Sequence, residues 1–267
     1  MIRAAVAGVA GRMGSRIAQI LGESEGIELS GGFEYSDHPL VGKDLAEAIG
    51  GAPTGRKIRG RIEEVLGDAE VVIDFTNATS SLKHLQAASA RGLHMVIGST
   101  GFTPAQLEEA GKLASSVSCV VSPNMSVGVN ILFKLVSEAT RLLGEDCDIE
   151  IIEAHHRFKK DAPSGTALKL AQIAAAARGR DLGEVGVYAR HGLIGERTGE
   201  EIGIQTIRAG DITGEHTVMF ASLGERIELV HKAHNRDNFA RGAIRAAKWV
   251  VTRPPGIYDM SDVLGIK

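Results

Sequence analysis

The chain has 267 residues, 43% of them hydrophobic and 24% charged, which is the composition of a globular protein with one large or two modest domains. Thirty basic against 33 acidic side chains give a net charge of −3, and since no basic block is present, a nucleic-acid partner is not expected. The apolar runs are shorter than the ~20 residues that span a membrane, and the start lacks a secretory signal pattern, so we expect a cytoplasmic protein with no membrane partner.

The first half of the chain alternates short, apolar, β-branched runs with helical stretches. Continuous apolar runs of this length are typical of buried parallel strands. The predicted strands cover residues 2–7, 27–33, 71–74, 94–97 and 118–121, and the predicted helices cover residues 12–21, 80–91 and 104–115. This alternation predicts an α/β fold with a doubly wound, Rossmann-like parallel sheet.

The alternation stops near residue 126. A long helix is predicted over 127–143, and a half-buried strand follows in the run DIEIIEAH. Further strand-like runs then follow one another without helices between them, at residues 202–208, 216–221 and 226–233. This succession predicts a second, α+β domain with an antiparallel or mixed sheet.

The last predicted helix, over 238–251, carries the only tryptophan and is expected to return to the first domain. The sequence therefore predicts an N-terminal domain over 1–126, rejoined by 236–267, and a C-terminal domain over 127–235.

Three glycines, Gly8, Gly11 and Gly14, follow the first predicted strand and open the first predicted helix. A pyrophosphate-binding turn needs glycine where the chain reverses, where backbone meets the anion and where helix meets strand. The common fingerprint spaces its first two glycines by one residue, whereas two residues intervene here, so the loop alone is a weak signal. Glu34 strengthens it, because an acid ending the second strand usually receives the adenosine ribose hydroxyls. The alternative is that the glycines only permit tight packing of the helix.

Two further loops follow predicted strands, at Gly98-Ser99-Thr100-Gly101 and at Ser122-Pro123-Asn124-Met125. Ligands of open α/β sheets bind at the carboxyl ends of parallel strands. Both loops are therefore candidate neighbours of a nicotinamide, although a loop of this kind taken alone is more often a simple turn.

The run EAHHRFKKDAPSGTA, residues 153–167, is the densest cluster of polar chemistry in the chain. Ser164 is expected to cap a helix, and a helix N-terminus beside lysine and histidine attracts carboxylates and permits proton transfer. His155 and Lys159 are the candidates for that transfer. Adjacent side chains of an extended segment point to opposite faces, so His155 and His156 are not expected to share a metal. Charged neighbours such as Arg157 are interpreted as a solvated surface.

Taken together, these segments resemble bacterial dihydrodipicolinate reductases. The similarity runs over nearly the whole chain and is carried by residues 8–14, 98–102, 124–130, 153–167, 208–216 and 224–226. The resemblance implies NAD(P)H-dependent reduction of a cyclic dicarboxylate in diaminopimelate and lysine biosynthesis. It also implies a nucleotide domain, a substrate domain that builds a homotetramer, and hinge closure between them.

The resemblance assigns roles by position. It implies that His155 and Lys159 are the acid/base pair and that His156, Ser164, Gly165 and Thr166 contact the substrate. The implied nucleotide contacts are Gly8, Val9, Ala10, Gly11, Arg12, Met13, Glu34, Tyr35, Gly98, Ser99, Thr100, Ser122, Pro123, Asn124 and Met125.

The chain departs from the family pattern at two of these positions. Ser99 stands where threonine is common, and Tyr35 stands where many members carry arginine. Without that arginine, the charge of Glu34 disfavours a 2′-phosphate, so use of both NADH and NADPH with a preference for NADH is expected. Arg12 or Arg16, near the glycine loop, could still reach the phosphate.

Other functions fit the sequence less well. A sugar dehydrogenase of similar layout would carry a lysine-proline motif, whereas here Pro123 follows Ser122. A semialdehyde dehydrogenase needs a nucleophilic cysteine, and neither Cys119 nor Cys147 lies in an evident loop; we interpret both as structural thiols in a reducing compartment. A non-catalytic dinucleotide sensor would have no use for the basic loop.

Overall fold

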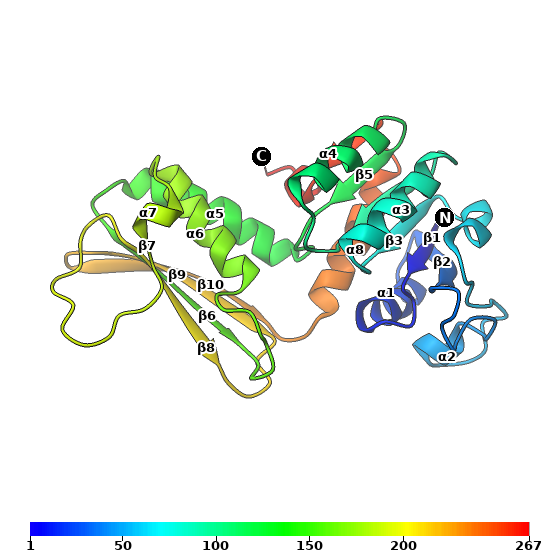
Figure 1. Ribbon diagram of the computed structural model, residues 1–267, viewed down its shortest axis with the longest axis horizontal. Coiled ribbons are helices and arrows are strands. Elements are labelled where there is room, and N and C mark those ends of the chain that lie inside the picture. The colour runs from blue at the N-terminus through cyan, green and yellow to red at the C-terminus, as the bar shows by residue number, and fades with distance from the viewer. Residues whose placement is uncertain (267) are drawn as a thin grey trace. The chain divides into compact units, whose positions relative to one another are not determined.

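The computed structural model describes residues 1–266 and divides into two compact units (Figure 1). Unit 1 comprises residues 1–127 and 237–265, and unit 2 comprises residues 128–236 together with residue 266. The segment that is predicted to rejoin the first domain extends to residue 267, and that last residue lies outside the described part of the chain.

Unit 1 is built on a six-stranded sheet in which every pairing is parallel. The strand order β11-β5-β4-β3-β1-β2 places β1 between β3 and the edge strand β2, so that the chain reverses direction across the sheet after β2, as in a doubly wound fold. The strands are β1 (Ile2–Ala7), β2 (Ile27–Phe33), β3 (Val71–Asp74), β4 (His94–Ile97), β5 (Ser118–Val121) and β11 (Gly256–Tyr258). The Rossmann-like prediction is confirmed; of these strands, only the short β11 was not expected.

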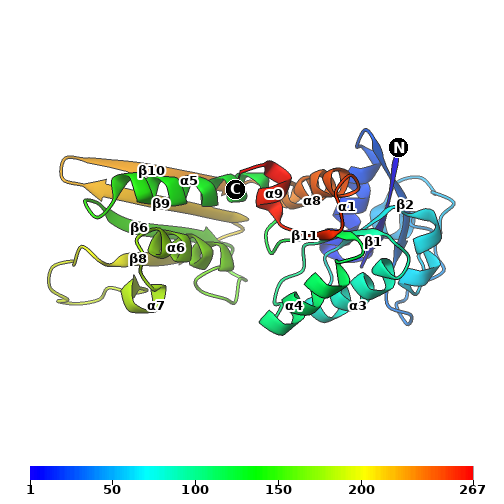
Figure 2. The same ribbon diagram turned by 90° about the horizontal axis from the view of Figure 1, so that it is seen from above.

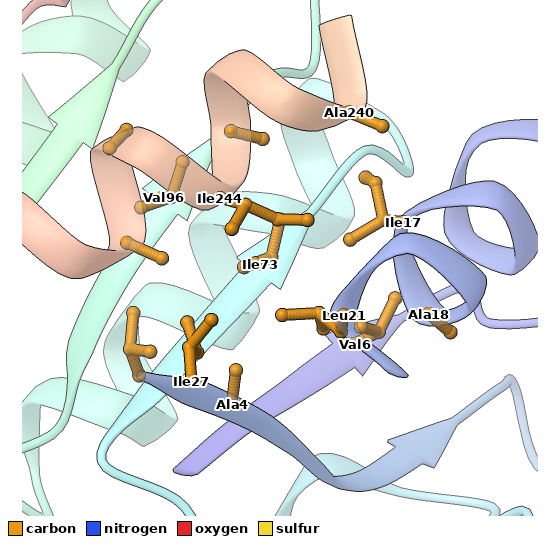
Figure 3. Close-up of a cluster of buried hydrophobic side chains, with 14 of the residues drawn as sticks. Ala4, Val6, Ile17, Ala18, Leu21, Ile27, Ile73, Val96, Ala240 and Ile244 are labelled. Carbon is orange, nitrogen blue, oxygen red and sulfur yellow. The ribbon is translucent and has the colours of Figure 1, made fainter. Parts of the chain in front are cut away.

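Helices cover both faces of this sheet, as Figure 2 shows. One side carries α1 (Arg12–Gly22), α8 (Asp237–Val250) and α9 (Met260–Leu264), and the other carries α3 (Ala78–Ser89) and α4 (Pro104–Leu113). Figure 3 shows the first layer, in which Ile17 and Leu21 of α1 pack with Ile244 of α8 over the strand residues Ile73 and Val96. Burial on both faces explains why these strands are apolar without alternation.

The segment between β2 and β3 contains short elements that the sequence did not indicate. They are α2 (Ala46–Ile49) and the 3₁₀ turns η1 (Ile62–Glu64) and η2 (Leu66–Asp68). This segment passes beside the end of β2, where Arg59 forms an isolated bridge with Phe33. It thereby supplies side chains to the carboxyl-end edge of the sheet.

Unit 2 has a five-stranded mixed sheet in the order β10-β9-β6-β8-β7. Its strands are β6 (Asp148–His155), β7 (Gly186–Val187), β8 (Ile202–Arg208), β9 (Gly214–Ser222) and β10 (Glu225–Ala233). The central strand β6 runs parallel to β8 and antiparallel to β9. The expectation of a mixed sheet is confirmed.

One face of this sheet packs against α5 (Val127–Leu143) and α6 (Gly165–Ala177), as Figures 1 and 2 show. The short α7 (Leu182–Val185) precedes β7. Ile149 and Ile151 of β6 point into this core, and the alternation of the strand places Glu153 on the same buried face. The fold therefore buries the Glu153 carboxylate two residues before the first of the two adjacent histidines.

Candidate functional site

The glycine loop joins β1 to α1 and depends on close backbone contacts. Gly8 has a φ of +63°, which favours glycine, and its carbonyl accepts a hydrogen bond of 2.9 Å from the Gly11 amide. A Cβ on Gly14 would lie only 2.0 Å from the Gly8 carbonyl oxygen, so the helix packs on the loop without room for a side chain. Within the described chain no side chain caps α1, and its first-turn amides suit an anion.

Glu34 follows β2 directly and faces this loop. Its Oε1 accepts a hydrogen bond of 2.9 Å from the Ala10 amide. The carboxylate lines a cavity of about 470 Å³ together with Gly8, Tyr35, Arg61 and Lys83. Tyr35 is 64% exposed and offers its ring rather than a charge. The cavity therefore combines a carboxylate suited to ribose hydroxyls with two cations from other segments.

Arg16 does not lie free near the loop. Its guanidinium donates two hydrogen bonds of 2.7 Å to the carboxylate of Asp237, at the start of α8. This bidentate pair joins the two helices and raises the pKa of Arg16 through the hydrogen bond to Asp237. The expectation that Arg16 could reach a phosphate is not supported by this geometry, because the guanidinium is already held.

The two remaining loops lie at the carboxyl ends of β4 and β5, which are neighbours in the sheet. The Ser122 amide donates to the Ile97 carbonyl at 3.0 Å and joins the loops. Ser99 is buried and its Oγ lies 2.8 Å from Ser81 Oγ, while Ser122 Oγ donates to the Asn124 carbonyl at 3.0 Å. These hydroxyls shape the loops, and the backbone of both loops borders the same edge of the sheet as the glycine loop.

In unit 2, Glu153 is the centre of the polar cluster. Its Oε2 lies 2.6 Å from His155 Nδ1, and its Oε1 accepts 2.9 Å from the Ser164 amide. Arg208 Nη1 and Nη2 donate to the two carboxylate oxygens at 2.8 and 2.9 Å. Burial by itself raises the pKa of Glu153, but the hydrogen bonds from Arg208, His155 and Ser164 outweigh it and bring the pKa to about 2. Glu153 is therefore ionised at neutral pH.

His155 ends β6 beside a second buried histidine. Its ring meets that of His216 edge to face, with 5.2 Å between centroids. Burial lowers the pKa of His155, and the nearby charges of Lys159 and Arg208 act in the same direction, whereas Glu153 raises it. Burial also lowers the pKa of His216 to about 3, so that His216 is neutral in this cluster.

Lys159 lies in the loop after β6, with its side chain 21% exposed. Its Nζ forms an ion pair of 2.9 Å with Asp161, and its amide donates to the His156 carbonyl at 3.1 Å. His156 Nδ1 is buried without a hydrogen-bond partner among the residues the structure describes. An ammonium and an unpaired imidazole nitrogen thus come from one short loop.

Ser164 caps α6 as expected, accepting a hydrogen bond of 3.2 Å from the Ala167 amide. Its Oγ also lies 3.2 Å from His216 Nε2, and the residue is almost fully buried. Gly165 and Thr166 form the first turn of α6. The arrangement can hold an anion at the helix start and offers a histidine and a lysine nearby for proton transfer.

Both units match models of one known protein family. Residues 2–125 match the family model described as dihydrodipicolinate reductase, N-terminus, and residues 128–264 match the one described as dihydrodipicolinate reductase, C-terminus. The chain belongs to the dihydrodipicolinate reductase family. It is therefore an oxidoreductase that uses a nicotinamide dinucleotide.

Similar members of the dihydrodipicolinate reductase family span the whole chain. The 4-hydroxy-tetrahydrodipicolinate reductase of Syntrophobacter fumaroxidans is 70% identical, and that of Syntrophus aciditrophicus is 54% identical, each over 100% of both chains. The dipicolinate-bound dihydrodipicolinate reductase from Paenisporosarcina sp. TG-14 is 28% identical with a TM-score of 0.77, covering 97% of each chain. An amine dehydrogenase from Mycobacterium smegmatis, 16% identical with a TM-score of 0.60 over 96% of this chain and 94% of its own, shares the fold alone.

Sequence reasoning missed several residues of this reductase that the fold brings to the two sites. Arg61 and Lys83 reach the cavity beside Glu34 from segments in which the sequence shows no motif. Arg208 and His216 reach Glu153 and His155 from β8 and β9. Glu153 itself carried a signal, because an acid in register with Ile149 and Ile151 points to a buried carboxylate.

None of the described helices is long and apolar enough to span a membrane.

Proposed function

We propose that this chain reduces 4-hydroxy-tetrahydrodipicolinate with NADH or NADPH, and that His155 and Lys159 supply the proton while the start of α6 holds a substrate carboxylate. The observation that carries the proposal is the cluster in which Glu153 contacts both His155 and the Ser164 amide at the helix start. This contact supports a proton donor at His155 beside an anion site at the helix start. The names of the curated relatives agree with a substrate of this class.

Unit 1 fits a dinucleotide. Gly8 and Gly14 let the loop and the helix pack where a Cβ would clash, and the cavity of about 470 Å³ beside Glu34 lies within the size range of small-molecule sites. When bound, the dihydronicotinamide supplies the hydride. Gly8, Gly11 and the first turn of α1 would hold the pyrophosphate, and Glu34 would accept hydrogen bonds from the ribose.

The residues of unit 2 would complete the reduction of the substrate ring. Loss of the 4-hydroxyl group as water gives the conjugated imine, and hydride addition at its C4 leaves electron density that a proton at C3 must quench. His155 and Lys159 are the groups that can hold this proton, and their positive charge would stabilise the electron-rich ring. The amides of Gly165 and Thr166 would receive one carboxylate, and the unpaired His156 Nδ1 would donate to an oxygen of the ligand.

A coupled assay tests this function. NADH or NADPH oxidation should depend on freshly generated 4-hydroxy-tetrahydrodipicolinate, and pyridine-2,6-dicarboxylate should compete with it because the planar ring keeps both carboxylates. The competition is expected since the Paenisporosarcina relative is dipicolinate-bound. A chain that binds NADH without consuming it in the presence of substrate would be a dinucleotide sensor, and failure of millimolar dicarboxylate to slow turnover would contradict the substrate site.

For the cofactor, we propose use of both nucleotides with a preference for NADH. Glu34 is positioned for free ribose hydroxyls, and Tyr35 brings no charge to a 2′-phosphate. Arg61 and Lys83 line the same cavity, and their charge offsets that of Glu34 when a phosphate is present. These opposing contributions limit the preference.

We also propose a homotetramer that covers the bare face of the unit 2 sheet. Strand register places Ile152, Ile207, Met219 and Val230 on the face opposite α5 and α6. Ile207 on β8 and Val230 on β10 are 46% and 49% exposed, and β6 and β9, which carry Ile152 and Met219, lie between them. Exposed apolar side chains spread across one sheet face are typical of an interaction surface. Light scattering should give a particle of about four times 28.2 kDa, and Val230→Lys should dissociate it. A monomeric wild-type chain would contradict the assembly.

A further inference from the structure

Glu153 receives hydrogen bonds from three separate elements of unit 2. His155 donates from the end of β6, the Ser164 amide donates from the cap of α6, and Thr206 Oγ1 (3.2 Å) and Arg208 donate from β8. The carboxylate is fully buried, and its low pKa keeps it charged throughout the working range of an enzyme. A buried charge with this many donors holds each donor in a fixed position.

The charge on Glu153 determines the protonation pattern of His155. An ionised carboxylate can only accept hydrogen bonds, so His155 Nδ1 must carry a hydrogen at the 2.6 Å contact. Nε2 is then the nitrogen that gains and loses a proton. A methyl group added at Gly214 would lie 3.1 Å from Nε2, so the glycine leaves space on that side of the ring.

The same carboxylate also holds the loop that carries Lys159. Arg208 Nη2 donates a hydrogen bond to Glu153 Oε1 and a second one, of 2.6 Å, to the Asp161 carbonyl. The side chain of Asp161 in turn pairs with Lys159 Nζ. Both candidate proton donors are thus connected to Glu153, one directly and one through Arg208.

We infer that Glu153 is a positioning residue of the reductase, which presents His155 Nε2 to the substrate and fixes the Lys159 loop through Arg208. The inference rests on the proposed role of His155 and Lys159 in the reaction. Glu153 does not touch the reacting atoms; it acts through the imidazole and the guanidinium.

The sign of the pH effect follows from the groups that face His155. Glu153 raises the pKa of His155, whereas burial, Lys159 and Arg208 lower it, and the neutral His216, with His231 behind it, adds no positive charge. A proton-donating His155 loses activity as pH rises through its pKa. Removal of the carboxylate charge should therefore move the high-pH limb of kcat/KM to lower pH, by about one pH unit.

The decisive variant is Glu153→Gln, which keeps the size of the side chain and removes its charge. We expect kcat/KM near neutral pH to fall about tenfold with the high-pH limb displaced downward, while NADH affinity stays unchanged. Glu153→Asp keeps the charge and should restore the position of the limb. The matched control is Glu150→Gln on the same strand, whose carboxylate pairs with Arg190 and Arg197 and faces no histidine among the contacts described.

A spectroscopic measurement on the unliganded wild-type protein is independent of turnover. With ¹⁵N-labelled histidine at a pH where His155 is neutral, its Nδ1 should be protonated and its Nε2 unprotonated, the signals being assigned by their loss in His155→Gln. Protonation at Nε2 would overturn the inference, as would a Glu153→Gln limb that moves no more than that of Glu150→Gln. Failure of the wild type to oxidise NADH with substrate would instead contradict the proposed function.

Discussion

Lys159→Ala is expected to lower kcat at least ~100-fold while the affinity for NADH stays close to that of the wild type. The side chain lies in the loop of unit 2 and forms its ion pair with Asp161, whereas the glycine loop and the Glu34 cavity belong to unit 1. In the proposed mechanism, loss of the ammonium removes a proton source and a positive charge that would lie near the substrate. It leaves the nucleotide contacts unaltered, so binding and chemistry should separate.

A second substitution separates the two roles of Lys159. Lys159→Arg keeps the positive charge, but a guanidinium does not release its proton near neutral pH. If Lys159 delivers the proton, arginine should restore little activity; if Lys159 only holds a carboxylate and His155 delivers the proton, arginine should restore much of it. Lys160→Ala, at the exposed neighbouring position, is the matched control and should turn over normally. Near-native kcat in Lys159→Ala would remove Lys159 from the reaction.

The strands of unit 1 could be predicted because their environment is simple. Residues 71–74 and 95–97 are buried on both faces, so every position is apolar or, at Asp74, held by hydrogen bonds. β11 could not be predicted in the same way, since its three residues are half exposed and its strand conformation depends on pairing with β5. The fold class follows from local pattern, whereas the edge of the sheet follows from tertiary contact.

The same distinction separates the predicted site residues from those that were missed. His155, Lys159 and Ser164 lie within one short run, so their proximity was visible in the sequence. Arg208 contacts Glu153 only because β8 lies parallel to β6, and His216 reaches His155 from the antiparallel β9. Strand order is set by packing of the whole unit, and spacing along the chain carries no direct record of it.

The nucleotide preference is the second prediction with a large effect. NADH should be used at least as well as NADPH, because the Glu34 carboxylate is held by the Ala10 amide where ribose hydroxyls would bind and would repel a 2′-phosphate. Arg16 cannot offset that repulsion while it is paired with Asp237. The exposed Arg61 and Lys83 can, which is why we expect NADPH to be used as well.

Tyr35→Arg tests this directly. A guanidinium at this position can make two charge-assisted hydrogen bonds to the phosphate, whereas the phenol can give one neutral hydrogen bond. We expect kcat/KM for NADPH to rise about tenfold, equivalent to ~1.4 kcal/mol, with little change for NADH. Tyr35→Phe is the matched control, since it keeps the ring without the hydroxyl and should leave the ratio nearly unchanged. Both nucleotides must be compared at one ionic strength because screening weakens exposed charges.

Two results would contradict this account of the cofactor site. A wild-type preference for NADPH above ~10-fold would mean that Arg61 and Lys83 outweigh Glu34. Absence of any gain for NADPH in Tyr35→Arg would mean that position 35 does not reach the 2′-phosphate. In the second case Arg61→Ala and Lys83→Ala identify the cation that does, because loss of the contacting side chain should lower kcat/KM for NADPH and leave NADH unaffected. Both side chains line the same cavity as Glu34, so at least one of these two variants should respond if the 2′-phosphate of NADPH binds there.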